Sequence, residues 1–474
     1  MKKRTVHLLI FLLVVSNLLT FRVTRNAYRL TMPTLPPAAY GNAAGDDLSL
    51  ELKPFVEAFN ILVQRHLDEV AKEELIDAAI KGMVDSLDDP QTSFLDAEHW
   101  EEMMMKIDGS FSGIGIEINV VNEYITIIAP IKNTPGEQAG LLAGDRIVAV
   151  DGASLVGATT MEAVKLMRGP TGTEVTLTVE RDGLPAPLTF QITRGNIVLP
   201  SVFPEMLAGK IGYIEVTTFD EHTGSDFREA LLLLETQGMK ALILDLRDNP
   251  GGLLNEAIKV GQELLPAGPI THVVDRHGVI QRTYSSFGVQ KPYPIVVLVN
   301  GASASAAEII AGAFQDTGTG TLVGTKTYGK ATVQQMERLS NSAGLRYTVA
   351  KYQTPSGRDI NGKGLEPDVV VELPTEYILL YHQLVNDLRP GDKDVFVTFL
   401  QKMLVALKFD VTETGTYDQA TERAVRAFQS KHGLAVSGVA DAATRSKLSQ
   451  EIEALLRQSD SQLKKGKEIL LEKI

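Results

Sequence analysis

The feature that most constrains the fold is an alternation of strand-like and helix-like patterns between residues 210 and 371. Short apolar runs rich in β-branched residues alternate with longer amphipathic stretches, in the order 210–216, 224–238, 241–247, 253–265, 294–300 and 305–318. Such alternation is typical of a layered α/β core in which helices cover a partly parallel sheet. Functional sites of such folds are usually built from loops at the carboxyl ends of the strands.

The rest of the chain shows different patterns. Residues 45–100 predict an N-terminal helical segment, because apolar residues recur there at spacings of three and four. Residues 105–195 predict a separate β-rich domain, inserted before the α/β core of residues 200–375. Residues 388–450 predict three short amphipathic helices, and residues 451–474 a charged helical tail at the surface. The predicted fold class is therefore multidomain, α/β and α+β.

Composition excludes several classes of protein. The 474 residues carry a formal net charge of −13, which argues against nucleic-acid binding because that function needs a basic face. The chain contains no cysteine, so disulfides and thiolate-bound zinc are excluded. No group of histidine and acidic residues has the spacing of metal ligands, and we expect neither a metal nor a cofactor.

The first 21 residues have the features of a targeting segment. Lys2, Lys3 and Arg4 precede an apolar run over residues 6–19, which is shorter than the roughly 20 residues of a full membrane span. Positive charge also follows the run, so charge does not decide the orientation. We expect a signal peptide or a short membrane anchor, and therefore an exported protein.

The stretch VNGASASAAEII, residues 299–310, lies where a strand pattern gives way to a helix pattern. Ser305, followed three residues later by Glu308, matches a capping box at the start of the helix. The small residues around Ser305 would also let a substrate backbone approach, and exposed N–H groups at a helix N-terminus, including that of Ala306, would bind an oxyanion. Ser305 is a candidate nucleophile as well as a cap, and the two interpretations are compatible.

A nucleophilic serine needs a base, and the sequence offers a lysine and two histidines. Lys330 follows a glycine among small or apolar residues, where burial would lower its pKa toward neutrality. If residues 331–334 are extended, Gln334 shares a face with Lys330, and its neutral amide would hold the lysine nitrogen toward the serine. The alternative is that Lys330 is a surface lysine in a turn, with no catalytic role. His222 and His277 are the candidates for a histidine triad, although neither lies in a recognisable triad motif.

Several motifs, in the same order along the chain, resemble the carboxy-terminal processing proteases, also called tail-specific proteases. They are GMVDSLDDPQTSFL, FSGIGIEI, LDLRDNPGG, SASAAEIIAGAFQD with GTKTYGKATVQ, and TPSGRDINGKGLEPD. The resemblance covers most of the chain and implies a serine endopeptidase whose α/β core is the protease. It implies Ser305 as nucleophile, Lys330 as general base and Gln334 as the residue that orients the lysine. Ser303 is then a neighbouring serine that takes no part in the reaction.

The resemblance also implies an oxyanion hole of two backbone N–H groups. One belongs to Ala306 and the other to Gly252 or Gly251, with Gly252 favoured. The sequence departs from the common pattern of the family at Ala307 and Ala331, and neither departure removes a catalytic group.

The inserted domain, residues 105–195, resembles a PDZ domain whose carboxylate-binding loop has the sequence SGIGI. A PDZ domain takes an extended peptide as an added strand, and its loop N–H groups receive the C-terminal carboxylate. The partners expected are therefore protein or peptide substrates bound by their C-terminal segment. Arg168, just before GPTG, is expected to couple this domain to the protease, a role inferred from its position alone. The peptide-binding residues expected are Ser112, Gly113, Ile114, Gly115 and Ile116.

The three-helix segment of residues 388–450 resembles a small peptidoglycan-binding-like module. It is expected either to contact the cell wall or to pack against the protease or a second subunit. The resemblance further implies a homodimer formed through helical end segments, and regulatory or processing proteolysis outside the cytoplasm. In spore-forming bacteria, relatives with this architecture serve developmental signalling.

Two other functions fit parts of the sequence. One is a scaffold in which the PDZ and wall-binding modules act and the protease core is inert, and the intact Ser305, Lys330 and Gln334 argue against it. The other is an acyl-transfer or acyl-CoA enzyme, because related layered folds carry such chemistry. A PDZ carboxylate-binding loop has no use in that enzyme.

Overall fold

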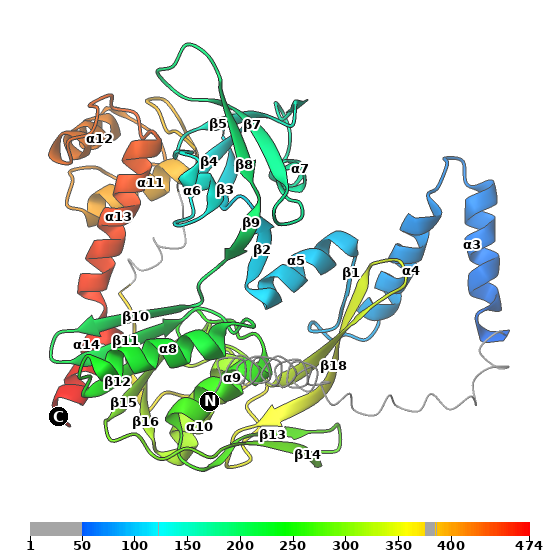
Figure 1. The fold of residues 1–474 in the computed structure, drawn as a ribbon, viewed down its shortest axis with the longest axis vertical. Coiled ribbons are helices and arrows are strands. Elements are labelled where there is room, and N and C mark those ends of the chain that lie inside the picture. Colours follow the sequence, from blue (N-terminus) through cyan, green and yellow to red (C-terminus); the bar gives the residue numbers. More distant parts are fainter. Residues whose placement is uncertain (1–49, 122, 375–383, 385) are drawn as a thin grey trace, which may run out of the picture. The chain divides into compact units, whose positions relative to one another are not determined.

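The computed structural model describes residues 50–121, 123–374, 384 and 386–474, so the targeting segment predicted for residues 1–21 lies outside the described residues (Figure 1). The chain divides into two units, Met1–Met83 and Val84–Ile474. The first unit contains α3 (Lys53–Arg65) and most of α4 (Lys72–Asp85). These two helices agree with the helical pattern of the sequence.

The second unit begins with β1 (Ser93–Leu95) and α5 (Ala97–Asp108). Asp96 caps α5, because its side chain accepts a hydrogen bond from the His99 N–H. β1 pairs with β18 (Gly344–Gln353) of the α/β core. The β-rich domain is therefore inserted between two parts of the chain that share one sheet.

The inserted domain is built on an antiparallel sheet with the strand order β3-β4-β5-β7-β8, and β6 pairs with β5. Its core is formed by alternate residues of the strands, such as Ile125 and Ile127, which are fully buried. β2 and β9 form a separate two-stranded ribbon. The elements are β2 (Ser110–Gly113), β3 (Ile116–Val121), β4 (Tyr124–Pro130), α6 (Pro135–Gln138), β5 (Arg146–Val150), β6 (Ala153–Ser154), α7 (Thr160–Met167), β7 (Glu174–Glu180), β8 (Leu188–Thr193) and β9 (Gly195–Val198).

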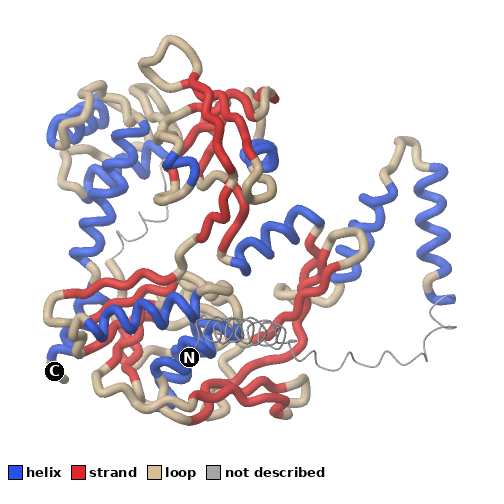
Figure 2. The backbone as a smooth tube through the Cα atoms, in the orientation of Figure 1, coloured by secondary structure: helices blue, strands red, loops and turns tan. Residues whose placement is uncertain are grey.

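The α/β core has a mostly parallel sheet with the order β10-β11-β12-β15-β16-β19, in which only the β10–β11 pair is antiparallel. Leu242 and Leu244 of β12 face the cluster that includes α8, α9 and α10, whereas Ala241 and Ile243 face α14. Helices therefore cover both faces of the sheet (Figure 2). The elements are β10 (Val202–Leu207), β11 (Ile211–Val216), α8 (Thr223–Thr236), β12 (Ala241–Asp245), α9 (Leu254–Leu264), β15 (Ile295–Val299), α10 (Ala306–Thr317), β16 (Gly320–Gly324), β19 (Val369–Val370) and α14 (Ser461–Leu471).

A second sheet in the core has the order β1-β18-β13-β14, and β17 also pairs with β18. Its remaining strands are β13 (Gly268–Val274), β14 (Ile280–Ser286) and β17 (Thr332–Arg338). β17 begins two residues after Lys330. The predicted fold class is confirmed: a layered α/β core with an inserted PDZ-like domain, an N-terminal helical segment and a C-terminal helical module.

The C-terminal module contains α11 (Val395–Ala406), α12 (Gln419–Lys431) and α13 (Ala442–Ser459), each capped by the aspartate before it. Gln401 and Gln429 are fully buried and play equivalent parts. The Gln401 amide binds the backbone at Thr414–Thr416 and the hydroxyl of Thr421. Gln429 binds Gly438, the Val439 carbonyl and the hydroxyl of Thr444 in the same way. The two GxxDxxT phrases of the sequence are thus two copies of one loop-to-helix turn.

Residues 451–474 are helical as predicted, but the expectation that this tail lies at the surface is wrong. Asp460 ends α13 and caps α14, and α14 packs against the parallel sheet. The buried residues of α14 are Gln462, Gly466 and Leu470, which lie four apart on one face. Because only the leucine is strongly apolar, the buried face was hidden in a sequence rich in lysine.

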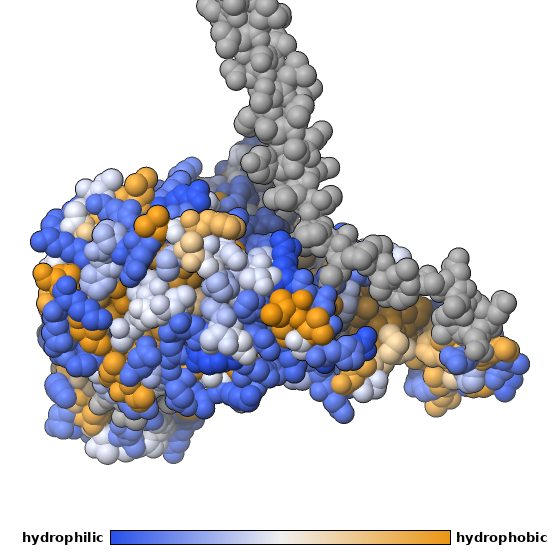
Figure 3. Space-filling view, turned by 90° about the horizontal axis from the view of Figure 1, so that it is seen from below, coloured by the Kyte–Doolittle hydropathy of each residue, from blue (hydrophilic) through white to orange (hydrophobic). Residues whose placement is uncertain are grey.

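No helix among the described residues combines the length and the apolar character needed to cross a membrane. On the face drawn in Figure 3, hydrophobic residues stand in small groups among hydrophilic ones.

Candidate active site

Ser305 lies at the turn between β15 and α10, at the carboxyl end of a parallel strand. Its backbone angles are φ 55° and ψ −115°, a conformation that costs a non-glycine residue free energy. A strained strand-to-helix turn of this kind exposes a nucleophilic serine in other hydrolases. Ser305 is half-buried here, whereas Ser303 is fully buried and donates its hydroxyl to the Leu246 carbonyl at 2.7 Å.

Glu308 joins the segment of Ser305 to the segment of Lys330. One carboxylate oxygen accepts the N–H of Ser305 at 3.0 Å and the N–H of Lys330 at 2.8 Å. The other accepts the Gly329 N–H at 2.7 Å and the Thr327 hydroxyl at 2.5 Å. Burial raises the pKa of Glu308, and these four hydrogen bonds oppose the rise because they stabilise the charged form. A single buried side chain therefore fixes the backbone of both candidate catalytic residues.

Tyr352 makes a second link between the same two segments. Its hydroxyl lies 2.9 Å from the Ser305 carbonyl oxygen and 2.6 Å from that of Lys330, so it can donate to either. The side chain is 1% exposed and lies on β18. The Ser305 and Lys330 segments are thus joined twice. Their N–H groups bind the Glu308 carboxylate, and their carbonyl groups face the Tyr352 hydroxyl.

Lys330 is half-buried and carries a lowered pKa. Burial is the main cause, because it disfavours the charged ammonium, and the positive charge of Arg346 adds to it. Asp89 acts in the opposite direction. Gly329 has φ +88°, and a Cβ atom there would lie 2.6 Å from the Gly364 nitrogen, so only glycine fits before the lysine. The lowered pKa is the property that a general base needs.

Gln334 lies on β17, where its amide nitrogen donates to the Thr332 hydroxyl at 2.8 Å. The pairing of β17 with β18 shifts register between Val333 and Gln334. Among the hydrogen bonds of the described residues, Gln334 is bonded to Thr332 and not to Lys330. Its orienting role therefore stays a prediction.

Of the two glycines predicted for the oxyanion hole, Gly251 lies beside Ser305, and Gly252 follows it in the chain. A Cβ atom on Gly251 would lie 2.7 Å from the Ser305 Cβ and 3.0 Å from the Ala306 nitrogen. The Gly251 N–H is already donated to Asn249 Oδ1 at 2.8 Å. No hydrogen bond in the described part of the chain uses the Gly252 N–H. Gly252 is therefore the better candidate, together with Ala306, whose N–H belongs to the first turn of α10 and has no partner within the helix.

The two candidate histidines lie elsewhere in the core. His222 precedes α8, and His277 is exposed in the turn between β13 and β14. Within the described ranges, neither forms a hydrogen bond or ion pair with Ser305. Among the contacts that the structure describes, neither histidine shares the Glu308 and Tyr352 hydrogen bonds that join the Lys330 segment to the Ser305 segment, so Lys330 stays the candidate base.

In the inserted domain, the predicted peptide-binding residues 112–116 lead into β3, which is an edge strand of its sheet. An edge strand has unpaired N–H and C=O groups that can receive an extended peptide. Gly115 has φ +75°, and a Cβ there would lie 2.3 Å from Thr134. The Ser112 hydroxyl donates to the Gly169 carbonyl at 2.6 Å and lies 2.9 Å from the Thr171 hydroxyl, and its peptide-binding role stays a prediction.

Arg168 lies over the ring of Phe111 at 5.4 Å, and the nearby carboxylates of Glu101 and Glu102 oppose the lowering of its pKa by burial. These neighbours belong to β2 and α5. The coupling role predicted for Arg168 stays a prediction.

Sequence reasoning missed Tyr352, Asp89 and Arg346 as neighbours of the site. It identified Glu308 only as half of a capping box. The box was the available signal for Glu308. Asp89 lies in the motif GMVDSLDDPQTSFL, but the motif does not indicate that its charge acts on Lys330, and Tyr352 and Arg346 lie outside the quoted motifs.

A serine in a strained strand-to-helix turn, a half-buried lysine whose backbone is held by the same Glu308 carboxylate, and a PDZ-like domain are features of a serine peptidase. Comparisons with known proteins agree. Residues 210–371 match the model of peptidase family S41, residues 126–181 a PDZ domain, residues 393–448 a putative peptidoglycan binding domain, and residues 22–99 the activating protease CtpB N-terminal domain.

Curated relatives extend over nearly the whole chain. The chain is 35% identical to carboxy-terminal processing protease CtpA of Bacillus subtilis over 458 residues, which cover 96% of each protein. It is 33% identical to CtpB of the same organism, over 84% of each protein. It is 41% identical to a carboxy-terminal-processing protease of Bartonella bacilliformis, over 68% of this chain and 76% of the relative. The chain belongs to the carboxy-terminal processing protease family of serine peptidases.

Proposed function

We propose that this protein is an endopeptidase in which Ser305 is the nucleophile and Lys330 the general base. Ser305 Oγ attacks the scissile carbonyl while Lys330 Nζ takes its proton, and the acyl-enzyme forms as Lys330 gives that proton to the leaving amine. Lys330, neutral again, takes a proton from the water that hydrolyses the acyl-enzyme and returns it to Ser305 Oγ. The N–H groups of Ala306 and Gly252 bind the oxyanion in both steps. The observation that carries the proposal is the double attachment of the Ser305 and Lys330 backbones to buried Glu308.

Substrate selection is assigned to the PDZ domain. The free edge of β3 accepts the C-terminal residues of a substrate as an added strand, and the N–H groups of residues 113–116 receive the carboxylate. The cleavage is regulatory or processing proteolysis, of which sporulation signalling is one form.

Three segments support a proposal for where the protein is located and how it assembles: residues 1–21, residues 388–450 and α3. The basic start and apolar run of residues 1–21 support export with a possible tether to the membrane, and the module of residues 388–450 supports contact with the cell wall. In its own unit, α3 has no buried residue and exposes apolar side chains such as Phe55 and Ile61. A second copy of the chain that covers this face would make a homodimer.

The function is tested with the chain from Gly45 onward, incubated with casein and, separately, with a fluorophosphonate probe that labels nucleophilic serines. We expect the wild-type chain to cleave casein and to take up the probe at Ser305, and Ser305→Ala to do neither. Ser225→Ala is the matched control, because Ser225 also lies in the first turn of a helix but is exposed and distant in sequence. A wild-type chain that neither cleaves nor labels, even with C-terminal peptides added, would favour the scaffold.

The charges around Lys330 predict a pH dependence with a definite sign. The base must be neutral, so the rate rises with pH through the pKa of Lys330. Arg346→Gln removes a charge that lowers this pKa, so the rising limb moves to higher pH and the rate at pH 7 falls. Asp89→Asn removes a charge that raises it, so the limb moves to lower pH. The measurement is the pH profile of kcat, with Arg346→Lys as the control that keeps the charge, and equal profiles in all variants would contradict the assignment of the base.

A further inference from the structure

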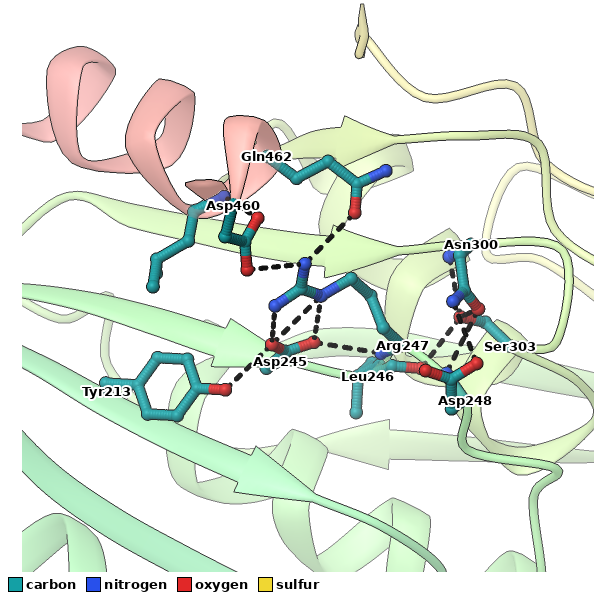
Figure 4. A network of polar contacts seen from close by, with 10 residues as sticks. Tyr213, Asp245, Leu246, Arg247, Asp248, Asn300, Ser303, Asp460 and Gln462 are labelled. Atoms are coloured by element: carbon teal, nitrogen blue, oxygen red, sulfur yellow. Dashed lines mark hydrogen bonds and ion pairs between the residues drawn. The ribbon is translucent and has the colours of Figure 1, made fainter. Parts of the chain in front are cut away.

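Arg247 lies at the junction between the protease sheet and the C-terminal helix. Its guanidinium binds the Asp245 carboxylate through Nε and Nη2 at 2.6 to 3.0 Å. Its third nitrogen, Nη1, lies 2.9 Å from Asp460 and 3.1 Å from the side-chain oxygen of Gln462 (Figure 4). The Arg247 side chain is only 12% exposed. A buried guanidinium held on two sides in this way has little freedom to move.

The position of Asp460 and Gln462 is itself fixed by the docking of α14. Asp460 caps the helix by accepting the Leu463 N–H at 2.8 Å. The Gln462 amide donates to the Val371 carbonyl at 2.8 Å, and Ser461 donates to the Glu372 carbonyl at 2.6 Å. Along the helix, a Cβ on Gly466 would lie 3.2 Å from Val296, so α14 lies close against the sheet.

The segment that follows Arg247 leads directly to the catalytic loops. The Asn300 side chain accepts the Asp248 N–H and donates to the Asp248 carboxylate, both at 3.0 Å. The Asn249 carbonyl accepts the Ala304 N–H at 2.9 Å. Gly251, two residues further along the chain, lies beside Ser305, and Gly252 follows it. Any displacement of Arg247 would therefore be passed to the loop that carries the proposed oxyanion donors.

We infer that α14 is part of the catalytic scaffold, and that Asp460 and Gln462 act through Arg247 as positioning residues for the oxyanion loop of residues 248–252. This inference rests on the proposed function, because it assumes that this loop binds the oxyanion. It assigns a catalytic purpose to a segment that lies beyond the peptidoglycan-binding-like module. A donor that is held slightly out of place stabilises the transition state less than a donor in its correct position, while the binding of the substrate is little changed.

The test uses Asp460→Ser, in which serine still caps α14 but is too short to reach Arg247. Ser461→Ala is the matched control, since it removes a contact of α14 with the sheet that does not involve Arg247. We measure kcat and KM on a peptide substrate, the inhibition constant of a peptide aldehyde whose adduct with Ser305 places an oxyanion in the hole, and the melting temperature. In Asp460→Ser we expect kcat and aldehyde affinity to fall together, by about 10- to 100-fold, with KM nearly unchanged. Ser461→Ala should retain both.

Asp460→Asn keeps one oxygen, which can accept from the Leu463 N–H or from Arg247 but not from both in the present geometry, so it should recover only part of the lost kcat. It also replaces Asp460→Ser if that variant is unfolded at the assay temperature. Unchanged kcat and aldehyde affinity in folded Asp460→Ser would overturn the inference, and so would an equal loss in Ser461→Ala, because the effect would then belong to helix docking in general. A wild-type chain that is inactive and unlabelled by the fluorophosphonate would instead overturn the proposed function, and this inference with it.

Discussion

Replacing Lys330 with alanine is expected to lower kcat by about 10⁴- to 10⁶-fold, the loss seen when a hydrolase of this kind loses its base. The variant should fold, because the contacts that hold this segment are made by the backbone. The N–H of residue 330 donates to Glu308, and its carbonyl accepts from Tyr352. The measurement is cleavage of a fluorogenic peptide at saturating concentration, together with the melting temperature of each variant.

The control for this variant is Lys326→Ala. Lys326 lies four residues earlier in the same loop, is exposed, and pairs with Glu366 at the surface at 2.8 Å. Its loss should leave kcat within about twofold of wild type, because surface ion pairs contribute little. If Lys330→Ala kept substantial activity and His277→Ala or His222→Ala lost it, the base would be a histidine, and the rate would show a limb near pH 6 to 7.

Replacing Glu308 with glutamine is expected to lower kcat by about 100-fold, although Glu308 is not proposed to touch the substrate. The carboxylate accepts four hydrogen bonds, from Ser305, Lys330, Gly329 and Thr327. An amide keeps only one oxygen, so its NH₂ group would face two of these donors. The backbones of Ser305 and Lys330 would separate, and the free energy of unfolding should fall by about 1–3 kcal/mol because buried donors lose their partners.

Glu256→Gln is the matched control for Glu308→Gln. Glu256 is also a buried carboxylate, and it accepts the Gly224 N–H at 3.1 Å and binds Lys259 at 2.6 Å, away from the Ser305 and Lys330 segments. We expect this control to lower the melting temperature and to leave kcat nearly unchanged. A fall of kcat in Glu308→Gln that is no larger than in Glu256→Gln would show that Glu308 serves stability alone.

The alternation of patterns in residues 210–371 predicted the parallel part of the fold closely. Helices expected at 253–265 and 305–318 are α9 (Leu254–Leu264) and α10 (Ala306–Thr317). Buried strands and amphipathic helices have distinct periods, so each shows in its own residues. The second sheet was not foreseen, because its pairing of β1 with β18 joins segments about 250 residues apart. Such pairings depend on sheet order, which periodicity does not contain.

The candidate site, like the fold, was predictable only where local sequence carries the signal. Ser305 and Lys330 stand in local motifs that resemble a known family, and local sequence suffices to mark them. Gln334 bonds to Thr332, two residues away on the same face of β17, and the sequence pattern did not distinguish this partner from Lys330. Arg346 lies on β18 and Asp89 precedes β1, and their charges act on the pKa of Lys330. The sequence near either residue does not indicate this effect on the lysine.

The sequence by itself determined the class of fold, the order of the domains and the identity of the two candidate catalytic residues, because each is encoded in residues close together along the chain. Only the tertiary structure decided how Glu308 and Tyr352 bind the segments of Ser305 and Lys330, and how α14 reaches Arg247 across 215 residues. Buried polar groups must find partners wherever folding brings them. Which partners those are depends on the packing of distant segments, and that packing is fixed only when the whole core forms.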